Sequence, residues 1–131
     1  MAAPARSHVA AGPVVLVVDD EPAVCRITAR TLAGLGFAVL EAHSGDEALG
    51  ILETASVLAV VTDLRMRPMT GLELYEHIRR RWPGLPVLLM SGYAENALPA
   101  YPASFLPKPF TAERLLSVVR ELLATGDAPP P

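Results

Sequence analysis

The feature that most constrains the fold is a series of short, uncharged, largely β-branched runs, each followed by a segment with helical spacing. The first run, Val14–Val18, is wholly apolar and ends at three consecutive acids, Asp19, Asp20 and Glu21. An unbroken apolar run of this length is typical of a strand buried on both faces. Such strands form parallel sheets covered by helices, so the sequence predicts an α/β fold.

Four more strands are expected, over residues 37–42, 57–62, 86–90 and 105–106. Pro22 is suited to the first turn of the helix after the first strand, and Gly34 and Gly36 are expected to end that helix. The spacing i, i+4, i+8 predicts that its inward residues are Ile27, Thr31 and Leu35.

The later helices begin at capping residues. Residues 44–47 and 70–73 have the Ser/Thr-x-x-Glu pattern of a capping box, and Thr111 is expected to cap the last helix. Helical spacing predicts an apolar face for each of these helices: Ala48, Leu49, Ile51 and Leu52; Leu74, Ile78 and Trp82; Leu115, Val118, Val119 and Leu122.

The length of 131 residues fits one domain. We expect a disordered tail at residues 1–12, a folded domain at 13–124, and a disordered tail or linker at 125–131. With 51% hydrophobic and 19% charged residues the chain is globular in composition. No apolar run approaches the roughly 18–20 residues that span a bilayer, and no secretory signal is evident, so a cytoplasmic location is expected. The net charge of −3 argues against nucleic-acid binding.

Polar residues follow four of the five predicted strands. The first strand leads into Asp19 and Asp20, the third into Asp63, the fourth into Ser91 and the fifth into Lys108, the only lysine among ten arginines. In a doubly wound sheet, ligands bind outside the carboxyl ends of the strands. The expected fold is a flavodoxin-like, five-stranded parallel sheet in the order 2-1-3-4-5, an order adopted by analogy, and it would bring these residues together.

Clustered carboxylates repel one another, and a hard cation relieves that repulsion. Oxygen ligands suit Mg²⁺, which also takes phosphate oxygens. A lysine ammonium suits a phosphoryl oxygen, and one accessible carboxylate can act as a nucleophile and become an aspartyl phosphate. The sequence therefore predicts phosphoryl-transfer chemistry.

Four motifs resemble the response-regulator receiver domain of two-component signalling. They are VVLVVDDEP, VVTDLRMRPMTG, MSG and FLPKPF, in that order, and the resemblance runs from about residue 13 to residue 124. It implies a bacterial phosphoprotein that takes a phosphoryl group from a sensor histidine kinase or a histidine phosphotransfer domain. Such a domain catalyses its own phosphorylation and dephosphorylation but is mainly a switch, here a monomer or weak dimer.

The resemblance also implies a role for each matching residue. Asp63 is the phosphoacceptor; Asp19 and Asp20, with Asp63 and the backbone carbonyl of Arg65, hold Mg²⁺; Lys108 pairs with the phosphoryl group; Ser91 is the switch hydroxyl and Phe105 the switch aromatic. Partner contact is expected on the first-helix side and at Pro109–Phe110.

Three features depart from the family pattern. Arg67 stands where a proline usually follows the methionine of the loop, and the proline comes one residue later. The segment from Ser91 to Lys108 is short and contains Pro99 and Pro102, so the fourth helix is expected to be short or irregular. Phe105 replaces the commoner tyrosine. MSGYA with a reduced fourth helix resembles the receivers attached to hybrid sensor histidine kinases.

Plainer interpretations compete at several positions. Asp19, Asp20 and Asp63 could be helix caps, and Lys108 a surface lysine. The three histidines, His8, His43 and His77, are expected at the surface. Cys25, which has no second cysteine for a disulfide, is expected to pack within a helix. Residues 79–81, all arginine, suit a solvated helix C-terminus. Phe110 suits either the core or a docking surface.

Two other function classes are open. A degenerate receiver would serve only as a protein-interaction module, and the altered Arg67–Pro68 loop leaves this alternative open. A small-molecule enzyme on the same fold is disfavoured, because no Gly-rich phosphate loop follows the first strand and its acids would repel an anion. An aspartyl phosphatase of the common type would have a second acid two residues after Asp63, where this chain has Arg65.

Overall fold

A single six-stranded sheet forms the centre of the computed structural model, which describes residues 7–8, 14–91 and 104–124. The strands are β1 (Ser7–His8), β2 (Val14–Val18), β3 (Ala38–Ala42), β4 (Ala59–Asp63), β5 (Val87–Ser91) and β6 (Ser104–Pro107). The helices are α1 (Pro22–Gly34), α2 (Gly45–Thr54), α3 (Gly71–Arg81) and α4 (Ala112–Ala124).

The five parallel strands have the predicted order. The sheet runs β1-β3-β2-β4-β5-β6, and every pairing from β3 to β6 is parallel. Counting β2 as the first parallel strand gives 2-1-3-4-5, which confirms the flavodoxin-like prediction. The two-residue β1 was not predicted; it pairs antiparallel with β3, so that Ser7 is opposite Leu40.

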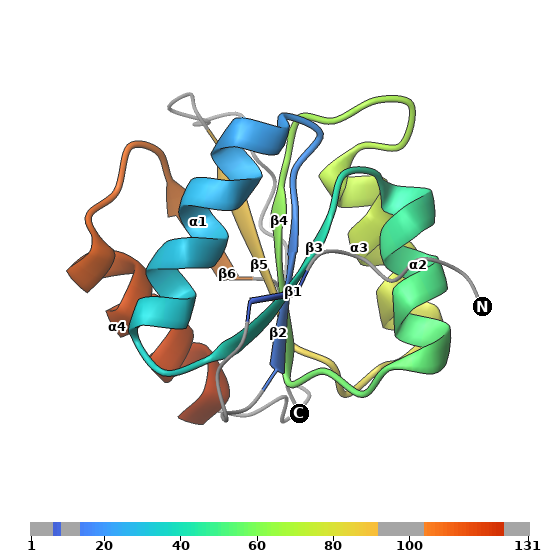
Figure 1. The fold of residues 1–131 in the computed structure, drawn as a ribbon. Helices are drawn as coiled ribbons and strands as arrows, with labels where there is room; N and C mark the ends of the chain where they lie inside the picture. The colour runs from blue at the N-terminus through green and yellow to red at the C-terminus, as the bar shows by residue number, and fades with distance from the viewer. Residues whose placement is uncertain (1–6, 9–13, 92–103, 125–131) are drawn as a thin grey trace.

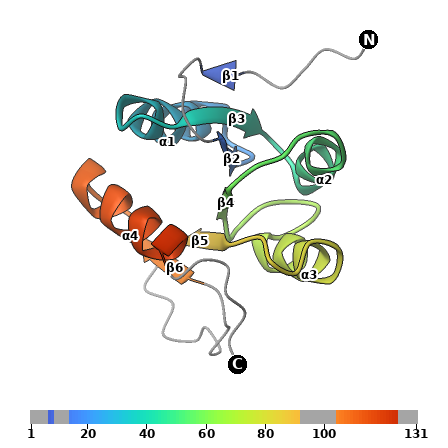
Figure 2. The ribbon, with the colours of Figure 1, turned by 90° about the horizontal axis from the view of Figure 1, so that it is seen from below.

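Helices cover both faces of the sheet, as Figures 1 and 2 show: α1 and α4 lie on one side, α2 and α3 on the other. Successive side chains of a strand point to opposite faces, so β2 sends Val15 and Val17 to the core under α1 and α4, and Leu16 and Val18 to the core under α2 and α3. All four are fully buried, as the unbroken apolar run predicts.

The buried face of α1 differs from the predicted one. Ile27 is 65% exposed, and the helix instead buries Cys25, Thr28, Ala29 and Leu32. Of the predicted face, Leu35 is partly buried against the core under α1 and α4, whereas Ile27 points away from the sheet. The helix ends as predicted, with Gly36 in the left-handed region at φ 104°.

Side-chain caps start the other helices. Thr70 and Glu73 form the full reciprocal capping box of α3. Ser44 accepts from the Glu47 backbone N–H at 3.0 Å, but the Glu47 carboxylate accepts from the N–H of His43 instead of closing the box. Thr111 accepts from the Arg114 N–H at 3.0 Å, as predicted.

The faces predicted for α2, α3 and α4 pack against the sheet. Leu74, Ile78 and the four α4 residues are buried, while Leu49, Ile51 and Trp82 are partly buried against the core. The predicted fourth helix, between β5 and β6, lies outside the described residues. Among the residues that the structure describes, no helix is long and apolar enough to cross a membrane.

Candidate functional site

The predicted site residues meet at the carboxyl end of the sheet. Asp19 follows β2 directly, and its backbone N–H donates to the Ala42 carbonyl at the end of β3. Asp63 is the last residue of β4 and lies opposite Met90 of β5, so Ser91 stands one position beyond it on the neighbouring strand. Parallel pairing therefore brings together residues from distant parts of the chain.

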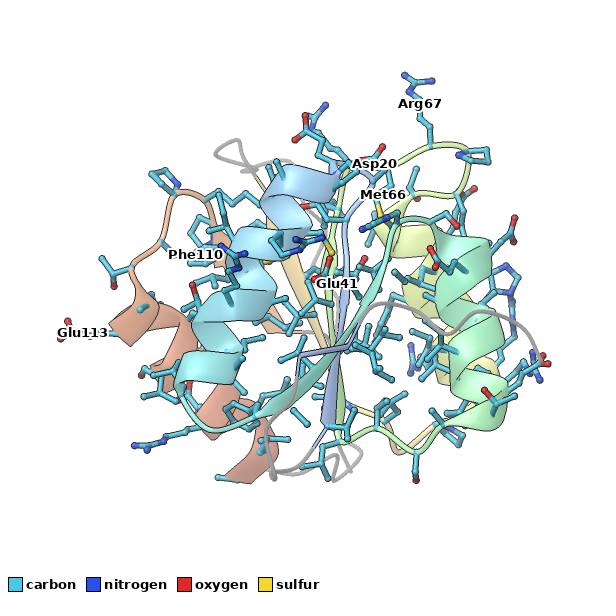
Figure 3. The ribbon with its side chains drawn as sticks, in the orientation of Figure 1. Asp20, Glu41, Met66, Arg67, Phe110 and Glu113 are labelled. Carbon is cyan, nitrogen blue, oxygen red and sulfur yellow. The ribbon has the colours of Figure 1, made fainter. Side chains whose placement is uncertain are left out.

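Three carboxylates form the floor and rim of this site. Asp19, Asp20 and Asp63 each offer an oxygen within 4.8 Å of the other two. Asp19 and Asp63 are buried, at 1% and 8% exposure, whereas Asp20 is exposed at the mouth of the site; Figure 3 shows Asp20 at the top of α1. The site is thus open to solvent on the side of Asp20.

Lys108 supplies the positive charge. Its Nζ lies 2.8 Å from Oδ1 of Asp63 and 3.4 Å from Oδ2 of Asp19. Its backbone N–H donates to the Ser91 carbonyl at 2.6 Å, which fixes the start of the loop after β6. The peptide bond from Lys108 to Pro109 is cis.

Backbone N–H groups hold the two buried carboxylates. The Glu21 N–H donates to Oδ1 of Asp19 at 3.0 Å, and the Arg65 N–H donates to Oδ2 of Asp63 at 3.1 Å. Both bonds join residues two positions apart, which is the local Asx geometry that a short turn after a strand allows. The orientation of each carboxylate is therefore set by the loop that follows it.

The charges of the site perturb one another. Burial raises the pKa of Asp19, and the nearby charge of Asp63 adds to this, against the Glu21 N–H and the Lys108 ammonium, which favour the ionised form. Burial alone would lower the pKa of Lys108, but the hydrogen bond to Asp63 and the charge of Asp19 outweigh it, so this pKa is raised. Without a bound cation, Lys108 is thus the counter-charge of the two buried acids.

The loop between β4 and α3 closes tightly over Asp63. The Gly71 N–H donates to the Leu64 carbonyl at 2.9 Å. A Cβ at Gly71 would collide with the carbonyl oxygen of Asp63 and lie 2.8 Å from Cα of Leu64. Met66 is buried, whereas Arg67 is exposed, and Figure 3 shows it projecting away from the domain. The Arg67–Pro68 peptide bond is cis.

Ser91 and Phe105 lie beside the site on β5 and β6. Ser91 is fully buried. Phe105 pairs with Leu89 across the two strands and packs, half-buried, against the core under α2 and α3. Phe105 therefore lies on the opposite side of the sheet from Phe110, which packs against the core under α1 and α4.

The sequence did not predict a second polar cluster between α1 and β3. Cys25 is buried, as expected, but so is Glu41, at 1% exposure. His43, predicted to be an ordinary surface residue, is half-buried, with Nε2 3.6 Å from the Glu41 carboxylate. Glu41 and His43 lie two positions apart, at and just after the end of a strand, and that spacing was the available signal.

The prediction for the arginine run is confirmed. Residues 79–81 end α3 and are all exposed. Arg81 pairs with Glu53 of α2 at 2.8 Å and lies over the Trp82 ring, 4.5 Å from its centroid. The run thus serves a helix end and a surface ion pair.

Comparison with known proteins identifies this arrangement. The family model of the response regulator receiver domain matches residues 15–120. The chain is 42% identical over 120 residues to sensor kinase CckA of Brucella abortus, covering 86% of this chain and 13% of the kinase. It is 37% identical over 114 residues to response regulator MprA of Mycobacterium avium, covering 83% of this chain and 50% of the regulator. The chain thus spans half or less of these relatives.

Solved structures agree with the sequence matches. The response regulator protein TrrA of Thermotoga maritima, in complex with Mg²⁺-BeF, superposes with a TM-score of 0.78 at 28% identity, covering 85% of this chain and 99% of TrrA. A response regulator receiver protein of Sinorhizobium medicae gives a TM-score of 0.78 at 30% identity, covering 87% of this chain and 96% of that one.

Proposed function

The chain belongs to the response regulator receiver domain family, and we propose on that basis that Asp63 accepts a phosphoryl group from a histidine kinase or phosphotransfer protein. The observation that carries the proposal is the Lys108 ammonium, 2.8 Å from Asp63 inside a group of three carboxylates. Acids packed this closely need a cation, and an ammonium beside one of them is ready to neutralise a phosphoryl oxygen.

In the transfer, a carboxylate oxygen of Asp63 forms a bond to phosphorus while the bond from phosphorus to the donor's imidazole nitrogen breaks. The imidazole leaves and takes up a proton from solvent, and Asp63 becomes an acyl phosphate. Lys108 then shifts from the carboxylate to the new phosphoryl oxygens. Catalysis of this kind rests on positioning and charge neutralisation, which the Arg65 N–H and the Lys108 loop provide.

The donor atoms at the site fit Mg²⁺. Carboxylate oxygens of Asp19, Asp20 and Asp63 lie within 4.8 Å of one another, and the set contains oxygen alone. In this proposal they hold the ion together with the Arg65 backbone carbonyl. When bound, Mg²⁺ offsets the negative charge that gathers as donor and acceptor approach. The switch roles of Ser91 and Phe105 belong to the same proposal.

The partner is proposed to dock beside the site, over α1. An apolar groove there is lined by Ile27, Phe110 and Pro109, and Lys108 is also among its lining residues. Ile27 is 65% exposed although it is a large aliphatic residue. A donor histidine on a partner seated over this groove would be near Asp63, in line with the contact expected from the sequence.

Intact mass spectrometry tests the phosphoacceptor. The reduced protein is incubated with a small-molecule phosphodonor and Mg²⁺. We expect a gain of one phosphoryl group, lost in Asp63→Asn because an amide is a poor nucleophile. Asp46→Asn, an exposed acid in the first turn of α2, is the matched control and should gain the full mass. A full gain by Asp63→Asn would refute the assignment; no gain by the parent would favour the degenerate receiver.

Titration calorimetry tests the magnesium ligands. Asp20 is exposed, so Asp20→Ala should leave the fold intact. Changes to groups that only orient a metal ligand typically weaken binding by about 10–100-fold. Loss of a direct ligand should therefore weaken Mg²⁺ binding roughly tenfold or more. Unchanged affinity in Asp20→Ala would show that the ion is held elsewhere.

A further inference from the structure

The polar cluster between α1 and β3 has the composition of a transition-metal site. Cys25 of α1, Glu41 of β3 and His43 just beyond β3 each offer one ligand atom, and these atoms all lie within 4.8 Å of one another. Figure 3 shows Glu41 in the layer between α1 and the strands. The cluster shares no ligand with the site formed by Asp19, Asp20 and Asp63, which we call the acidic site.

The local structure explains why these three side chains meet. Glu41 and His43 are two positions apart, so their side chains leave the backbone on the same side. Cys25 lies on the buried face of α1 and points onto that side, with Sγ 3.7 Å from the carbonyls of Val17 and Ala42. One helix and one strand end therefore form the cluster.

Burial and a fixed Glu41 carboxylate organise the cluster. Cys25 and Glu41 are at most 1% exposed. Arg26 contacts Oε2 of Glu41 at 3.2 Å, which holds the carboxylate in place. The other oxygen, Oε1, lies 3.6 Å from Nε2 of His43. That Nε2 atom is buried and makes no hydrogen bond within the part of the chain that the structure describes.

We propose that Cys25 Sγ, Glu41 Oε1 and His43 Nε2 bind a divalent transition-metal ion of the zinc type, at a second site separate from the carboxylate pocket. Sulfur and imidazole nitrogen favour Zn²⁺ over Mg²⁺, which prefers oxygen ligands. On binding, the Sγ–H bond breaks, the proton passes to solvent and a bond from sulfur to the metal forms, with no change of oxidation state. Three protein ligands leave a fourth position for water.

The two sites are expected to differ in selectivity. The ligand atoms at Asp19, Asp20 and Asp63 are all carboxylate oxygens, whereas this cluster has one oxygen, one nitrogen and one sulfur. The His43 side chain is 39% exposed, so an ion can enter from that side without opening the core. Excess Mg²⁺ should therefore fill the acidic site and leave the second site available.

Cobalt spectroscopy tests the proposal. The reduced full chain, in saturating Mg²⁺, is titrated with Co²⁺ and then with Zn²⁺. We expect one equivalent of Co²⁺ to produce a thiolate-to-cobalt charge-transfer band in the near ultraviolet, and Zn²⁺ to remove it. Because Cys25 is the only cysteine, this band reports sulfur ligation at one position. Absence of the band at micromolar protein and metal would overturn the proposal.

Variants separate the ligands from the surroundings. His43→Gln removes a half-buried ligand without opening the core and should weaken Co²⁺ binding roughly tenfold or more. His77→Gln, at a half-buried histidine of α3, is the matched control and should bind as the parent does. Asp63→Asn should retain the band, which separates this site from the acidic one. Equal binding by His43→Gln and the parent would remove His43 from the site and refute the proposal.

Discussion

Lys108 carries the charge balance of the acidic site. It contacts two buried acids at 2.8 and 3.4 Å and is only 23% exposed. Removing it leaves Asp19 and Asp63 facing each other without a counter-charge. A cation that binds the same acids can replace it electrostatically, so the effect of its loss should depend on Mg²⁺.

We expect Lys108→Met to lower the free energy of unfolding by about 1–3 kcal/mol in magnesium-free buffer, the usual range for losing a charged partner of a buried group. Saturating Mg²⁺ should recover part of this loss. Because the folded pKa of Lys108 lies above its unfolded value of 10.5, its contribution is fully present below that pH and is lost as the pH rises through the folded pKa. Urea denaturation of the parent and of Lys108→Met, with and without Mg²⁺ and at several pH values, measures these free energies.

Arg120→Met is the control for this experiment, because Arg120 is an exposed cation of α4. Its loss should change stability by no more than about 0.5 kcal/mol, with or without Mg²⁺. Equal effects of the two substitutions would mean that Lys108 is not the counter-charge of the buried acids.

Cys25 should make the stability of the domain depend on alkaline pH, which an exposed thiol with an unshifted pKa would not do. Burial, with the charges of Glu41 and Asp19, raises its pKa from 9.0 to about 12. The folded protein then holds this proton while the unfolded chain loses it, so stability falls as the pH rises from 9 toward 12. When the pH is raised from about 7 to about 10 in the presence of a chelator, the free energy of unfolding of the parent should fall by about 1 kcal/mol more than that of Cys25→Ala. Urea denaturation measures both values.

Equal losses in the parent and in Cys25→Ala would contradict the shifted thiol. Alkylation gives a second measurement, because the thiolate is the reactive form. Iodoacetamide should label the folded parent far more slowly than the parent in urea.

The acidic site was predictable because its chemistry follows from position. Asp63 and Lys108 each follow an apolar run, and the parallel topology brings such residues to one edge. The Cys25, Glu41 and His43 cluster was not predictable in the same way. Which face of α1 is buried decides whether Cys25 meets β3, and the aliphatic spacing of Ile27 indicated a different face.

Among the helices and loops, the turn that carries Asp63 into α3 tolerates no added atom at Gly71. The collision of a Cβ there is with the backbone of Asp63 and Leu64, which cannot move aside as a side chain can. By contrast, a Cβ at Gly50, on the exposed side of α2, would meet nothing within 4 Å. Replacement by alanine should therefore lower the stability of the domain at Gly71 and raise it at Gly50.

We expect Gly71→Ala to destabilise the domain by about 1–3 kcal/mol, the usual range for overpacking, and to slow phosphorylation of Asp63. Gly50→Ala should stabilise it by roughly 0.5–1 kcal/mol, because alanine is the better helix former. Thermal denaturation of the parent and of both variants measures the two changes in stability. A stable, normally phosphorylated Gly71→Ala would show that the turn can shift away from Asp63.

For the whole domain, the apolar runs of the sequence predicted the parallel sheet better than they predicted its short edge strand. The five parallel strands were placed within one or two residues, since a strand buried on both faces leaves a continuous apolar run. The pairing of β1 could not be predicted, because Ser7 and His8 form only two residues of edge strand and carry no apolar pattern. Two-residue strands depend on the neighbour they pair with, here β3, and not on their own sequence.

Activation is expected to cause little association of the domain. Between β5 and β6 the sequence contains Pro99 and Pro102, and proline inside a helix kinks or breaks it. The resemblance to receivers implies that the helix of this segment is part of the face through which activated receivers pair. We therefore expect the domain to remain a monomer or weak dimer when Mg²⁺ and beryllofluoride, a phosphoryl mimic, occupy the acidic site.

Light scattering across a concentration series measures this association, with Asp63→Asn in the same buffer as the control. A ligand shifts an equilibrium only by its differential affinity for the two states. The resemblance to receivers implies that the switch aromatic turns inward on phosphorylation. Phe105 has no hydroxyl to desolvate, so its burial should cost less than that of a tyrosine, and its inward state should be partly populated before the mimic binds. Binding of the mimic should therefore shift this equilibrium little and cause little association. Conversion of the parent, but not of Asp63→Asn, to a tight dimer would show that the pairing face is intact and that the prolines do not weaken it.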